Sequence, residues 1–93
     1  MKSGHRTQRV TAVDLVHGQI RVPIGEKEPF PVTKGPITIR LRGARMTNVG
    51  WDPRLGPDRE RSGVVSVGAQ LRDFVGTDEV LYVTVIDGEV QLT

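Results

Sequence analysis

Arginine side chains are the groups in this 93-residue chain whose type and spacing point to chemistry. Six of them lie between Arg40 and Arg61, with Trp51, the only tryptophan, among them. Arginine carries a rigid, planar set of donors that pairs with phosphates and with guanine edges. Acidic residues also lie between these arginines. The segment therefore predicts either a nucleic-acid contact or a salt-bridged surface.

Groups that could carry catalysis are few. His5 and His17 are the only histidines, and neither has a second histidine or a cysteine at metal-ligand spacing. The chain has no cysteine, which excludes disulfides and thiolate metal sites. The serines lack a nucleophile-elbow context, and the glycines do not form a phosphate-binding loop. We therefore expect no enzymatic activity, no metal and no cofactor, and in particular no hydrolysis of DNA.

Charge is distributed unevenly along the chain. Residues 1–62 carry twelve Lys or Arg against six Asp or Glu, whereas residues 63–93 carry only Arg72 against five acidic residues. An anionic partner is therefore expected to meet the first two thirds of the chain. No apolar run approaches the roughly 20 residues that span a bilayer, and the N-terminus lacks a secretory signal. We expect a cytoplasmic protein with no membrane partner.

The elements that must position the arginines are mainly strands. Val, Ile and Thr supply 27 residues and Ala, Leu and Met only 11, which favours β-structure. Ile37, Ile39 and Leu41 alternate with polar residues, as in a half-buried strand. Pro23 should end regular pairing because it lacks a donor. Strands are predicted over residues 9–16, 19–24, 37–42, 45–51, 63–67, 79–86 and 89–93.

Two short helices and one long loop complete the predicted fold. A helical turn is expected over residues 26–30, and a helix over residues 69–75, which Gly76 ends. Asp87-Gly88 is a strong hairpin signal. The turn-rich residues 52–61 predict an exposed loop. The predicted fold is a mainly β, seven-stranded open pseudobarrel over residues 9–93, preceded by a flexible tail over residues 1–8.

Several short motifs follow one another in an order that is typical of a known family. They are Val10-Thr11-Ala12-Val13-Asp14-Leu15, Gly18-Gln19-Ile20-Arg21-Val22-Pro23, Phe30-Pro31, Trp51-Asp52-Pro53-Arg54, Arg61-Ser62-Gly63-Val64-Val65, and residues 71–75 followed by Thr77-Asp78-Glu79-Val80. Together they resemble the DNA-binding pseudobarrel shared by plant B-three transcription-factor domains and the recognition domains of certain bacterial restriction endonucleases. The chain departs from the family in having Pro23-Ile24 for Pro-Lys and Thr77-Asp78 for Gly-Asp.

The resemblance implies a sequence-specific double-stranded DNA-binding domain that grips the major groove with two arms, residues 17–21 and 48–62. Such a domain would work alone or as the targeting module of a restriction or regulatory system, with a nuclease or regulatory protein as partner. Arg21 is expected to point outward, opposite Ile20 and Val22. Phosphate contacts are also expected from Arg6 and Arg9. The implied DNA-binding residues are His17, Gln19, Arg21, Lys34, Asn48, Trp51, Asp52, Arg54, Arg59, Arg61 and Ser62.

Two other interpretations remain open at this point. A small β-barrel for protein interaction or assembly, of the phage or toxin–antitoxin type, would turn the arginine loop toward an acidic protein or solvent. An RNA-binding barrel is disfavoured, because single-stranded RNA modules use several aromatic platforms and aromatic residues are only 4% of this chain. Trp51 is expected to be a core anchor and not a stacking platform. Convergence of Arg21, Arg54, Arg59 and Arg61 on one concave face would favour nucleic acid.

Overall fold

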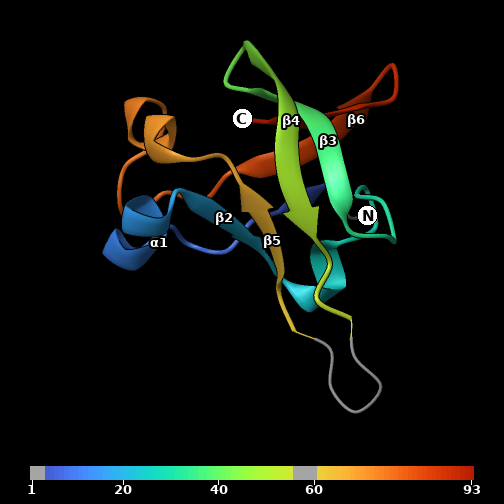
Figure 1. The fold of residues 1–93 in the computed structure, drawn as a ribbon, viewed down its shortest axis with the longest axis horizontal. Coiled ribbons are helices and arrows are strands. Elements are labelled where there is room, and N and C mark those ends of the chain that lie inside the picture. The colour runs from blue at the N-terminus through green and yellow to red at the C-terminus, as the bar shows by residue number, and fades with distance from the viewer. Residues whose placement is uncertain (1–3, 56–60) are drawn as a thin grey trace.

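Seven strands form one curled sheet in the computed structural model, which describes residues 4–55 and 61–93 (Figure 1). The sheet order is β1-β6-β7-β3-β4-β5-β2, and the neighbours are antiparallel except for the parallel pair β3 and β7. The predicted mainly β, seven-stranded barrel is confirmed. The strands are β1 (His5–Arg6), β2 (Gln19–Val22), β3 (Gly35–Leu41), β4 (Ala44–Asp52), β5 (Gly63–Ser66), β6 (Tyr82–Ile86) and β7 (Glu89–Leu92).

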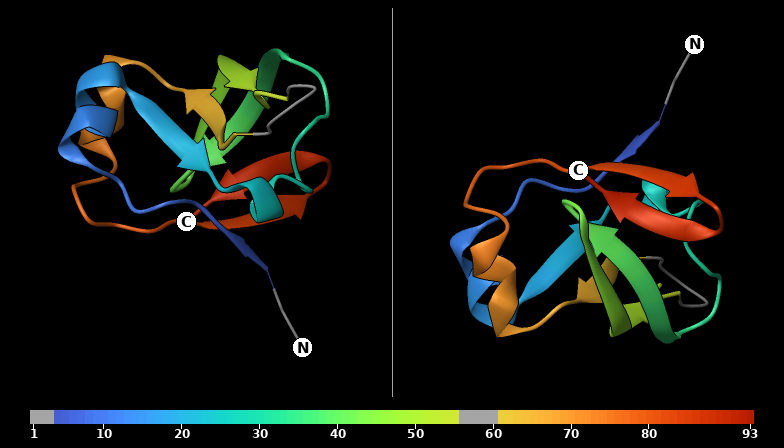
Figure 2. Two further views of the ribbon diagram at one scale, coloured as in Figure 1. Left: turned by 90° about the horizontal axis from the view of Figure 1, so that it is seen from below. Right: turned by 90° about the horizontal axis from the view of Figure 1, so that it is seen from above.

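The sheet curls until its two edges nearly meet (Figure 2). The segment after β1 connects them: the Thr7 amide donates to the Leu81 carbonyl at 2.9 Å, and the Gln8 amide donates to the Arg21 carbonyl of β2 at 2.9 Å. β1 itself pairs with β6. The ordered fold therefore begins before residue 9, inside the stretch for which the sequence predicts a flexible tail. Single backbone hydrogen bonds therefore bridge the two edges of the sheet. Among the described residues, no continuous ladder of hydrogen bonds joins β1 to β2.

The core follows the alternation of the strands. Ile20 and Val22 point inward from β2, while Gln19 and Arg21 are half-buried on the outer face of the same strand. Trp51 is 1% exposed, and its ring stacks on Phe30 with the centroids 4.4 Å apart. Its indole N–H donates to the carbonyl of Pro31 at 2.7 Å, which ties this connection to the barrel. Trp51 is therefore a core residue.

One of the strand predictions is wrong. Residues 12–16 do not extend the first strand but belong to the helix α1 (Ala12–His17). Thr11 caps this helix by accepting from the Asp14 amide, the Asp14 carboxylate accepts from the Thr11 amide, and Gly18 ends the helix with φ 65°. Val13, a β-branched residue that favoured the strand prediction, is 60% exposed and contributes little to the core.

The remaining helical segments are single 3₁₀ turns. They are η1 (Ile24–Glu26) and η2 (Ala69–Asp73). The turn expected over residues 26–30 therefore comes earlier in the chain, directly after Pro23. The helix expected over residues 69–75 is shorter, although Leu71 and Val75 are buried as its apolar face requires. α1 and η2 lie together beside β2 (Figure 1). No helix in the described part of the chain is long and apolar enough to cross a membrane.

Candidate nucleic-acid interface

A groove of about 640 Å³ crosses the outer face of β3, β4 and β5. The sheet register explains it, because Pro36, Gly50 and Ser66 lie side by side on neighbouring strands. Gly50 has no side chain, and a Cβ there would approach the Ser66 Cβ to 3.3 Å. Because the residues that point outward here are small, a ligand could approach the backbone of this face closely. The lining residues are Lys34, Gly35, Pro36, Gly50, Trp51, Asp52, Arg54, Val64 and Ser66.

Cationic side chains border one end of this groove. The Asp52 carboxylate accepts from the Arg54 amide at 2.9 Å and lies 3.8 Å from the Lys34 ammonium. The first contact supports the left-handed backbone of Arg54, with φ 55°. The Arg61 amide donates to the Arg54 carbonyl at 3.3 Å, which keeps the two residues adjacent. Within residues 4–55 and 61–93, the guanidinium groups of Arg54 and Arg61 have no polar partner.

Three other arginines of the run, Arg40, Arg42 and Arg45, lie at the far end of β4 and are engaged. Arg42 donates to the Glu79 carboxylate at 2.6 Å, and Arg45 donates to the Glu89 carboxylate at 3.0 Å. Arg40 lies 3.9 Å from the same Glu89. The salt-bridged interpretation therefore applies to these three arginines. The described arginines of the run therefore divide into Arg40, Arg42 and Arg45, which pair with acids at the β3–β4 hairpin, and Arg54 and Arg61, whose guanidinium groups meet no partner among the described residues.

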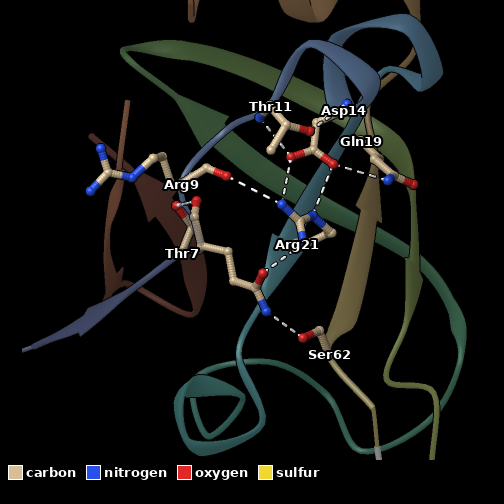
Figure 3. Close-up of polar contacts among 8 residues, drawn as sticks. Thr7, Arg9, Thr11, Asp14, Gln19, Arg21 and Ser62 are labelled. Carbon is tan, nitrogen blue, oxygen red and sulfur yellow. Dashed lines mark hydrogen bonds and ion pairs between the residues drawn. The ribbon is translucent and has the colours of Figure 1, made fainter. Parts of the chain in front are cut away.

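Arg21 is held in a partly buried ion pair (Figure 3). Its Nε and Nη2 donate to the two carboxylate oxygens of Asp14 at 2.9 and 3.0 Å. Nη1 donates to the Gln8 side-chain oxygen at 2.7 Å, and Nη2 also reaches the Arg9 carbonyl at 3.3 Å. Arg21 does point outward from β2, opposite Ile20 and Val22, but its guanidinium is engaged by these acceptors and is not free for a ligand. The reason is α1, which brings Asp14 over the outer face of β2.

The Asp14 carboxylate is the centre of this network. Its side chain is only 3% exposed, and it also accepts from the Gln19 amide nitrogen at 3.1 Å. Burial alone would raise the pKa of Asp14, but the hydrogen bonds from Arg21, from the Thr11 amide and from Gln19 together hold that pKa below its usual value. The carboxylate is therefore ionised at neutral pH and acts only as an acceptor.

The network continues to the base of the loop that follows β4. The Gln8 side-chain oxygen accepts a hydrogen bond from Nη1 of Arg21. Nε2 of Gln8 in turn donates to the hydroxyl of Ser62 (Figure 3). Ser62 follows Arg61 and precedes β5. A single chain of contacts thus connects the N-terminus of α1, the outer face of β2 and the cationic border of the groove.

The structure brings some of the predicted site residues together and separates others. Lys34, Asp52 and Arg54 line the groove, and Gln19 lies beside it. Trp51 also borders the groove, but it is 1% exposed and stacked on Phe30, so its ring has no face free for a base. His17 is exposed at the end of α1, Asn48 is exposed with φ 57° at an irregularity of β4, Ser62 is half-buried in the network, Arg6 and Arg9 do not line the groove, and Arg59 lies outside the described residues.

Sequence reasoning missed the groove floor and the network partners. Ser66 and Gly50 carry no charge, so nothing in their type marks them as part of a site. The role of Asp14 did have a signal, because Thr11 followed three residues later by an acidic residue is a helix-capping pattern. Gln8 had none, since its two contacts join residues far apart in the chain.

Comparison with known proteins identified no relative: no family model, curated protein or solved structure matches this chain. The functional assignment therefore depends on the geometry described above.

Proposed function

We propose that this chain is a sequence-specific double-stranded DNA-binding domain, and that the outer face of β3, β4 and β5 meets the duplex. The observation that carries the proposal is the pair of guanidinium groups of Arg54 and Arg61, which no residue in the described part of the chain engages, beside an open groove floored by small residues. DNA-binding proteins obtain most of their affinity from Lys and Arg contacts to phosphates, and their register on the duplex from the same contacts.

The small residues of the groove support this proposal for a geometric reason. A phosphodiester backbone can approach main-chain amides only where side chains do not stand in the way. Gly35, Gly50 and Ser66 supply such a surface, and Lys34, whose side chain is 76% exposed, stands next to it. Arg54 is the groove-lining residue best suited to a bidentate contact, because no acid among residues 4–55 and 61–93 engages its guanidinium.

The domain is proposed to act as the targeting module of a restriction or regulatory system. The proposed role of the chain is to contact DNA. The sequence predicts no catalytic constellation, so a partner nuclease or regulator would supply the activity. A module of this kind adds specificity to a partner without changing that partner's chemistry.

A protein-interaction module is the second candidate. Exposed apolar side chains on one face of β6 favour it: Tyr82 and Ile86 are 57% and 51% exposed. Exposed apolar groups that lie close together are typical of surfaces that bind other proteins. These residues lie on elements other than the groove strands, so the two roles are separable by mutation.

The test is duplex binding across a salt series, with random-sequence double-stranded DNA as the probe. Arg54→Ala and Arg61→Ala are expected to weaken binding and to lower the slope of log affinity against log salt by about one each. Arg45→Ala is the matched control, because it removes the same charge from the opposite end of β4.

Absence of wild-type binding at low salt would contradict the proposal. Equal effects of all three substitutions would contradict it as well, because they would reflect net charge and not this surface.

A further inference from the structure

We infer that Gln19 is a specificity-determining residue that recognises adenine in the major groove, with an amide oriented by Asp14. The inference rests on the proposed DNA-binding function and adds a base preference to it. Its basis is the 3.1 Å hydrogen bond in which the Gln19 amide nitrogen donates to a carboxylate oxygen of Asp14 (Figure 3).

Asp14 determines which way this amide faces. An ionised carboxylate has no donor, so it can receive the Gln19 N–H but would repel the Gln19 carbonyl oxygen. Asp14 cannot turn away, because Arg21 holds both of its oxygens and the Thr11 amide holds one of them at 2.9 Å. The Gln19 amide is thereby fixed in one orientation, with its carbonyl oxygen on the side away from Asp14 (Figure 3).

The remaining hydrogen-bonding groups of Gln19 select among the bases. One N–H is committed to Asp14, which leaves one N–H and the carbonyl oxygen for a ligand. Adenine presents one acceptor, N7, and one donor, the N6 amino group, in the major groove. Guanine presents two acceptors there and so would need two donors. The constrained amide therefore matches adenine and mismatches guanine.

The position of Gln19 is suitable for such a contact. It pairs in register with Ser66 on β5, and Ser66 in turn pairs with Gly50 on β4. Side chains of directly opposed residues share one face of a sheet, so Gln19 stands on the groove face and not inside the barrel. A duplex held by the cationic border would bring its base edges past this row of residues.

The experiment is a selection from random-sequence duplexes with the full chain, followed by sequencing of the bound pool. The wild type is expected to enrich a motif with a strongly preferred A·T pair. Gln19→Ala is expected to lose the preference at that one position, by about 5- to 150-fold in relative affinity, and to keep the remainder of the motif. Gln91→Ala is the matched control, because Gln91 is also a half-buried strand glutamine but lies on β7.

A second variant tests the role of Asp14 as a positioning residue. Asn in its place offers both a donor and an acceptor, so Asp14→Asn releases the constraint on the Gln19 amide. The adenine preference is then expected to relax toward guanine. Selections are run below the midpoint of each variant's thermal melt, and the Gln19→Ala result stands by itself if Asp14→Asn does not fold.

The outcomes separate the inference from the proposed function. If the wild type binds no duplex, the proposed function fails and the inference with it. If the wild type enriches a motif that Gln19→Ala enriches unchanged, or if the lost preference is for a G·C pair, the inference is overturned while DNA binding stands. Binding without any enriched motif overturns the inference too.

Discussion

Replacement of Arg21 by methionine is expected to destabilise the fold strongly. The substitution keeps the apolar stem of the side chain but leaves the Asp14 carboxylate, 3% exposed, without its principal partner. Breaking a buried ion pair costs about 3–5 kcal/mol. Because the Arg21 side chain is 28% exposed and water can partly replace it, we expect a loss of about 2–3 kcal/mol. For a domain of this size that lowers the melting temperature by about 10–20 °C.

The loss should depend on pH in a defined direction. Burial alone would raise the pKa of Asp14, but Arg21 and the other donors lower that pKa in the folded state. A carboxyl group with a lowered folded pKa stabilises the fold above its unfolded pKa, and this stability is lost as the pH falls through the folded pKa. The gap between wild type and Arg21→Met is therefore expected to be widest at neutral pH and to narrow below about pH 4.

Thermal melts followed by circular dichroism, from neutral pH to about pH 3, measure this gap. Arg45→Met is the control, since its ion pair with Glu89 is at the surface, with the Arg45 side chain 52% exposed, and is worth at most about 1 kcal/mol. The reasoning is refuted if Arg21→Met melts within a few degrees of the wild type at neutral pH, or if the gap does not change with pH.

Three further results are expected. Gly63→Ala should cost about 1–3 kcal/mol by urea unfolding, because the new Cβ would lie 2.4 Å from the Trp51 ring, whereas Gly25→Ala, with open space around it, should stay within about 0.5 kcal/mol; equal costs would mean that the ring can move aside. Thr11→Ala should cost about 1 kcal/mol through loss of the α1 cap, and the exposed Thr33→Ala should not, so similar melts for the two would argue against a stabilising cap. Purified protein incubated with duplex DNA and magnesium should leave the DNA uncut, and cleavage abolished by changing one acidic residue would contradict the absence of a catalytic centre expected from the sequence.

Much of the strand content could be predicted because local pattern and tertiary burial agree there. Ile39 and Leu41 alternate with polar residues and are fully buried, and Asp87-Gly88 joins two strands as its turn chemistry requires. The helix α1 could not be found from residue preference, because Val13 and Val16 favour strands and yet are exposed. Capping, which acts through a few backbone bonds, decided the structure of this segment.

The candidate site was harder to predict because its electrostatics depend on long-range pairs. Arg42 and Arg54 look alike in the sequence, but Arg42 meets Glu79, an acid from a distant part of the chain, whereas Arg54 meets no acid among the residues that the structure describes. Similarly, the pairing of Arg21 with Asp14 follows only once α1 is known to be a helix. Composition could therefore indicate an anionic partner but could not say which arginines remain free for it.

The most direct test of the proposed DNA-binding face is to follow the backbone amide resonances of isotope-labelled protein during titration with duplex DNA. The account predicts saturable shifts that concentrate on Gly35, Gly50, Arg54 and Ser66, with the β3–β4 hairpin around Arg42 unchanged. No saturable shift, or the largest shifts at that hairpin, would contradict it.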